Sequence, residues 1–232
     1  MLAELSTTQF WLELLEIIGI NILLSGDNAV VIALASRSLP DAQRKLAVMG
    51  GSAAAVILRI VLCLIIASVL QIPYLKLTGG ILLLYIGVKL VIAEESTGDA
   101  IAAKSHLWGA IQTILIADAV MSLDNVVAIA AAAHDSVLLI TLGLLISIPL
   151  IVFGSQLMLQ VLARFPFLVI LGGGLLGWIA GDILASDPAI YTVLPYDELL
   201  VARIAKPLLA VIVMAVGMVM ARRAAARDAT SL

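Results

Sequence analysis

The sequence predicts an all-α, polytopic membrane protein. Of its 232 residues, 63% are hydrophobic and only 12% are charged, and the mean hydropathy is +1.19. A water-soluble domain of this size has too little interior to bury so many apolar side chains. Apolar runs of about 20 residues recur along the chain, and each is long enough to cross a hydrocarbon layer about 30 Å thick. We therefore expect a single transmembrane domain over residues 1–232.

Seven segments are apolar enough over a window of about 19 residues to form transmembrane helices. In chain order they are residues 17–35, 46–69, 77–93, 107–133, 137–157, 167–184 and 204–220. Eight Lys and Arg residues follow the odd-numbered segments, whereas the opposite connections hold only Lys76 and Arg203. The positive-inside rule then places the amino terminus outside and the carboxyl terminus in the cytoplasm.

The first and fourth segments share a motif, Ser-x-Asp-Asn. We call residues 25–28 the first signature segment and residues 122–125 the second. Glycine pairs at 79–80 and 172–173 follow in the same order, which indicates a duplicated three-helix unit. Because three is odd, the two copies must enter the membrane from opposite sides. The sequence thus predicts two inverted repeats and a seventh helix, at about 10–95, 105–186 and 200–221.

Four aspartates lie well inside apolar segments, where an ionised carboxylate is costly and therefore a candidate for function. They are Asp27, Asp118, Asp124 and Asp182. Asp27 and Asp124 occupy matching positions of the two repeats. Gly26, beside Asp27, predicts an interruption of the first helix, which would free backbone carbonyl groups as further ligands.

Oxygen ligands of this kind fit a hard divalent cation such as Mg²⁺, Ca²⁺ or Mn²⁺. One aspartate from each half neutralises a doubly charged ion, and a nearby thioether favours the softer Mn²⁺. The candidate metal ligands are Ser25, Asp27, Asn28, Asp118, Met121, Ser122, Asp124 and Asn125.

The same acids have a second interpretation. A buried aspartate can pair with a base to fix helix packing, or it can relay protons, and the serines can bond back to their own helices. The candidates for ion pairs or a proton relay are Lys89, Arg59, Lys206 and Asp182.

Charge and motif content exclude several classes of function. The net charge is −3 and no basic cluster stands outside the membrane flanks, so we expect no nucleic-acid partner. No ATP-binding loop is present, so gradients must drive any transport. Protons compete with a metal ion for the same carboxylates, which favours cation/proton antiport. We expect a transporter and no enzyme, with no cofactor; the partners are the lipid bilayer, the divalent cation and protons.

Residues 26–33 and 122–130 resemble the signature segments of the TerC family of integral membrane proteins. The resemblance covers most of the chain and implies Mn²⁺ efflux across a bacterial inner membrane. It also implies that Asp27 and Asp124 matter most, with Asn28 and Asn125 beside them. Two alternatives stay open: an intramembrane aspartate-based enzyme, and an exporter of a small solute such as an amino acid or a tellurium compound.

Overall fold

The computed structural model describes residues 8–69, 72, 74–92, 100–133, 136–193 and 198–228. Throughout these ranges the regular structure is helical, which confirms the predicted all-α class. The helices are α1 (Thr8–Leu24), α2 (Gly26–Ser36), α3 (Asp41–Val69), α4 (Leu75–Ile92), α5 (Ala100–Ala132), α6 (Val137–Arg164), α7 (Leu168–Ala185), α8 (Pro188–Val193) and α9 (Glu198–Asp228).

Six of these helices are long and apolar enough to cross a membrane, and the bent pair α1–α2 makes up to seven spans. Each span coincides with one of the predicted segments. The helices extend beyond the predicted windows because a hydropathy window finds only the apolar middle of a helix. The short helix α8 was not predicted from the sequence, because its 6 residues are too few to cross a membrane.

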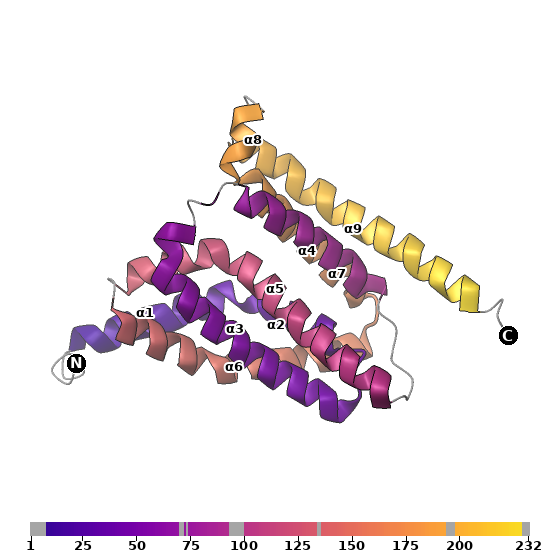
Figure 1. Ribbon diagram of the computed structural model, residues 1–232, viewed down its shortest axis with the longest axis horizontal. Helices are drawn as coiled ribbons and strands as arrows, with labels where there is room; N and C mark the ends of the chain where they lie inside the picture. The colour runs from indigo at the N-terminus through magenta and orange to yellow at the C-terminus, as the bar shows by residue number, and fades with distance from the viewer. Residues whose placement is uncertain are drawn as a thin grey trace.

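The helices pack in two groups (Figure 1). Helices α4, α7 and α9 lie together, while α1, α2, α3, α5 and α6 form the other group. Helix α1 packs on α6, and α3 packs on α5. Exchanging the first three spans for the second three converts one of these pairings into the other. This pattern is compatible with the inverted repeat, which stays a prediction.

Glycines bring α7 and α9 into close contact. A Cβ atom at Gly177 would lie 2.5 Å from the carbonyl oxygen of Leu209, and one at Gly181 would lie 2.8 Å from the backbone nitrogen of Lys206. Only hydrogen fits at these two positions, as at the small-residue interfaces common in membrane helices. The packing sets the position of α7 side chains relative to Lys206.

The first span is broken, as Gly26 predicts. Helix α1 ends at Leu24, α2 begins at Gly26, and the two axes are bent by 50°. Between them Ser25 has a non-helical backbone, with φ −110° and ψ 3°. Helix α5, by contrast, runs without interruption through the second signature segment.

Candidate functional site

The break places two polar stripes opposite each other. Asn21 lies in the last turn of α1 and Ser25 directly follows that helix, while Asp118 and Ser122 come from the middle of α5. Each pair is four residues apart, so its members share one helical face. We call these four residues the oxygen cage. All four side chains are buried, and α1 packs directly on α5.

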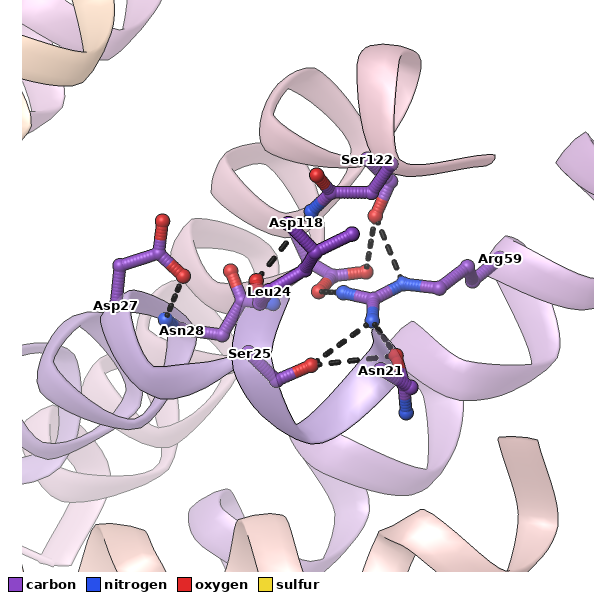
Figure 2. Close-up of polar contacts among 9 residues, drawn as sticks. Asn21, Leu24, Ser25, Asp27, Asn28, Arg59, Asp118 and Ser122 are labelled. Atoms are coloured by element: carbon purple, nitrogen blue, oxygen red, sulfur yellow. Dashed lines mark hydrogen bonds and ion pairs between the residues drawn. The ribbon is translucent and has the colours of Figure 1, made fainter. Parts of the chain in front are cut away.

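The guanidinium of Arg59, from α3, lies inside the oxygen cage (Figure 2). Its Nε donates to Ser122 Oγ at 2.9 Å, and its Nη1 donates to Asn21 Oδ1 at 2.7 Å and to Ser25 Oγ at 3.2 Å. Its Nη2 forms a hydrogen-bonded ion pair with Asp118 Oδ1. Arg59 is 1% exposed, and by residue volume it is the largest fully buried side chain among the described residues.

The cage residues also bond within each stripe. Ser25 Oγ donates to Asn21 Oδ1, and Ser122 Oγ donates to Asp118 Oδ2, both at 3.3 Å. The structure thus brings together Ser25, Asp118 and Ser122, as the predicted ligand set requires, around a cation that is part of the chain. Asn21 was missing from that set, although it lies one helical turn before Ser25 on the same face.

Asp27 and Asn28 lie on the other side of Leu24 from the guanidinium (Figure 2). Asp27 is half-buried in the first turn of α2, where its Oδ1 accepts a hydrogen bond from the backbone nitrogen of Asn28 at 2.8 Å. A carboxylate is favoured at this end of a helix because the backbone N–H groups there are unpaired. This contact holds the Asp27 carboxylate at the start of α2, next to Asn28.

The side-chain amide of Asn28 is 3% exposed, and neither its Oδ1 nor its Nδ2 has a hydrogen-bond partner among the described residues. Asn21 Nδ2 is likewise buried without a partner there. A buried polar group left unpaired costs about 1–3 kcal/mol. Because buried polar groups in proteins are rarely left unpaired, an unpaired amide next to a carboxylate indicates a candidate site for a polar ligand.

The remaining predicted ligands on α5 are Asn125 and Asp124, in the second signature segment, and Met121, directly before it. Asn125 Nδ2 donates to the carbonyl oxygen of Leu24 at 3.4 Å, at the point where α1 ends. That carbonyl is one of the last four of α1, which have no partner within the helix. Met121 is 5% exposed in the core. Asp124 belongs to α5, but its side chain lies outside the part of the chain that the structure describes.

The four residues proposed for ion pairs or proton relay separate into two places. Arg59 pairs with Asp118, as described above. Asp182 of α7 pairs with Lys206 of α9, with 2.6 Å between Oδ1 and Nζ, and the two belong to the other group of helices. Lys89 is exposed on α4. Repeat symmetry favours Lys89 as the base near Asp182, but the base that the structure pairs with Asp182 is Lys206, another of the proposed candidates.

Among the described residues, no three or more His, Cys, Asp and Glu side chains cluster closely enough to hold a metal ion. The polar groups described at the break are carboxylate, amide, hydroxyl and backbone carbonyl oxygens.

Comparison with known proteins identifies the family. A family model for integral membrane proteins of the TerC family matches residues 6–229. The chain is 45% identical over 178 residues to the uncharacterized membrane protein YjbE of Bacillus subtilis, covering 77% of this chain and 81% of that protein. It is 26% identical over 204 residues to the uncharacterized membrane protein YkoY of Bacillus subtilis, covering 79% of this chain and 61% of YkoY.

A further relative is UPF0053 protein YegH of Escherichia coli, 26% identical over 180 residues. The alignment covers 69% of this chain and 34% of YegH, so the chain matches about a third of that longer protein. No solved structure matches the chain. The family match spans nearly the whole sequence and includes both signature segments, so this multi-pass membrane protein belongs to the TerC family of integral membrane proteins.

Proposed function

We propose that this protein exports a divalent cation, Mn²⁺ by preference, from the bacterial cytoplasm in exchange for protons. The observation that carries the proposal is the buried, unpartnered amide of Asn28 beside the carboxylate of Asp27, at a break in a membrane span. Inverted-repeat transporters bind their substrates where such broken helices meet the other half. Helix α2 packs on α5, which carries the second Asp-Asn pair.

The ion pair of Arg59 sharpens the proposed ligand set. Because the guanidinium of an arginine carries a positive charge in proteins, Arg59 neutralises Asp118 as long as the two remain paired. The carboxylates left to balance a bound cation are then Asp27 and Asp124. Two negative charges match one divalent ion, and the amide oxygens of Asn28 and Asn125 complete a hard-oxygen site.

The break contributes backbone groups to the same place. The last carbonyls of α1 carry partial negative charge, and the carbonyl of Leu24 is directed toward Asn125 of α5. Carbonyl oxygens at unwound positions are ligands that broken-helix transporters offer to cations. The thioether of Met121 in the core of α5 favours Mn²⁺ over harder ions.

The carboxylates of Asp27 and Asp124 would also carry the exchanged protons. A carboxylate must lose its proton to bind a metal ion, and metal binding therefore releases protons. A protein that carries protons one way and the cation the other on the same two aspartates needs no other source of energy.

The test uses the full chain reconstituted in lipid vesicles, with a Mn²⁺-sensitive dye inside. Wild-type protein should carry Mn²⁺ faster when a pH gradient is imposed, and the Asp27→Asn and Asp124→Asn variants should lose more than about tenfold in rate. The matched control is Asp41→Asn, because Asp41 has a 90% exposed side chain paired with Arg44 in the α2–α3 region.

Wild-type rates in both aspartate variants would refute the site. Absence of Mn²⁺ transport by the wild type, with Ca²⁺, Mg²⁺, lysine and tellurite tested in the same vesicles, would refute the substrate. Transport insensitive to the pH gradient would refute the exchange with protons.

A further inference from the structure

We propose that the oxygen cage is a second cation site whose resting occupant is the guanidinium of Arg59, which competes with the transported ion. This inference rests on the proposed function, because it assigns a role to the arginine beside the same break. It starts from the four acceptors of the cage, all of which are aimed at one positive charge.

The chemistry of the cage is that of a metal site. One carboxylate, one amide oxygen and two hydroxyl oxygens surround the charge, and these are ligands that Mn²⁺, Mg²⁺ and Ca²⁺ accept. Arg59 reaches them from α3, so the cation is tethered to a different helix from the cage residues, which lie on α1, at the break after it and on α5. A divalent ion and a guanidinium cannot occupy it together, since they repel each other at close range.

The position of the cage gives this competition a consequence. Ser25 is both a cage residue and the residue at which the span breaks, and the next residues of the chain are Gly26, Asp27 and Asn28. An ion held by Asp27 and Asn28 is therefore separated from the oxygens that hold Arg59 by the break itself, at Leu24 and Ser25. When the guanidinium is in the cage, the ion is confined to the Asp27 side; when it leaves, Asp118 becomes available to the ion.

The return of the guanidinium to the cage would then help to expel the ion. This distinguishes the proposal from a purely structural role, in which Arg59 only ties α1, α3 and α5 together. A structural tie predicts that removing Arg59 weakens Mn²⁺ binding or leaves it unchanged. A competitor predicts that removing Arg59 strengthens Mn²⁺ binding while slowing release.

The experiment measures Mn²⁺ affinity of the purified full chain by isothermal titration, and Mn²⁺ transport in vesicles. Arg59→Ala should bind Mn²⁺ at least about tenfold more tightly. In the wild type the ion must displace the guanidinium and break its charged hydrogen bonds to the cage, and in the variant this cost is absent. Both KM and kcat for transport should fall. The Arg59→Ala/Asp118→Asn variant should show no gain in affinity, and Arg203→Gln, which removes an exposed arginine of α9, should behave as wild type.

A soluble guanidinium ion provides the second measurement. At millimolar concentration it should refill the cage of Arg59→Ala and reverse the gain in Mn²⁺ affinity, whereas equal concentrations of Na⁺ or urea should not. The wild type, whose cage is filled, should show no such effect. If Arg59→Ala does not fold, the Arg59→Lys variant provides the test. A lysine ammonium keeps the positive charge but cannot donate to all four acceptors of the cage. The Mn²⁺ affinity of Arg59→Lys should rise about threefold.

The outcomes separate this proposal from the proposed function. Unchanged or weaker binding by Arg59→Ala, or unchanged binding by Arg59→Lys where only that variant folds, overturns the competition and leaves transport by Asp27 and Asp124 intact. Wild-type protein that neither binds nor carries Mn²⁺ refutes the proposed function. Failure of both wild type and Arg59 variants to bind any divalent ion refutes both proposals.

Discussion

The two signature segments have nearly the same sequence and different structures. The first, Ser-Gly-Asp-Asn, is a break between α1 and α2 with a bend of 50°, whereas the second, Ser-Leu-Asp-Asn, is uninterrupted helix in α5. They differ inside the motif at one position, Gly26 against Leu123. Glycine in a helix interior costs about 1 kcal/mol relative to the best helix formers, of which leucine is one.

The difference indicates a division of labour. The first signature segment supplies backbone groups, the start of α2, and the Asp27 carboxylate beside the unpartnered amide of Asn28. The second signature segment supplies polar side chains from an unbroken helix. The supporting helices differ as well. Helix α3 provides Arg59 to the cage, whereas α6, which the predicted repeat pairs with α3, has no basic residue before Arg164 at its end.

The most direct way to remove the difference is Gly26→Leu, which gives the first segment the sequence of the second. A Cβ at Gly26 meets nothing within 4 Å and the residue is exposed, so folding should be unimpaired. Continuous helix becomes more favourable by about 1 kcal/mol. We expect vesicle transport of Mn²⁺ to fall more than about tenfold, because straightening the span displaces Asp27 and Asn28.

The matched control is Gly19→Leu, since Gly19 also lies on α1, is exposed and has nothing within 4 Å of its Cβ. It should transport as wild type. Equal transport by Gly26→Leu and Gly19→Leu would mean that the break is not needed, and the comparison between the two segments would lose its functional meaning.

The two asparagines offer a finer test. Asn28 is buried with both amide atoms unpartnered, whereas Asn125 donates one hydrogen bond to the carbonyl of Leu24. Asn28→Ala should raise the KM for Mn²⁺ about tenfold without lowering the thermal unfolding temperature, because it removes an unsatisfied polar group. Asn125→Ala should have a smaller effect on KM and should lower stability by about 1 kcal/mol, the usual contribution of one hydrogen bond.

The measurements are transport kinetics in vesicles and thermal unfolding in detergent. An Asn28→Ala protein that is less stable than wild type, with an unchanged KM, would show that Asn28 packs the helix and binds nothing.

Much of this asymmetry follows from the sequence, and some of it does not. The spans were predictable because a membrane imposes long apolar runs, and the break at Ser25 was predictable from Gly26 beside an acid within an apolar segment. The partner of each acid was not predictable. Arg59 could have paired with any of several aspartates, and only the packing of α3 on α5 selects Asp118. Likewise, Lys206 reaches Asp182 because Gly177 and Gly181 let α9 approach α7.

The smallest effect is expected at that second ion pair, which tests whether every intramembrane acid belongs to the mechanism. Asp182 has a 56% exposed side chain and joins α7 to α9, helices that lie in the group away from the break. The Asp182→Ala/Lys206→Ala variant should carry Mn²⁺ within about twofold of wild type, with a slightly lower unfolding temperature. A loss of transport comparable to that of Asp27→Asn would instead make Asp182 part of a proton path. The contrast between the two signature segments would then extend to a third region of the molecule. Removing both partners avoids leaving one charge unpaired, so any loss reports on function and not on a stranded charge.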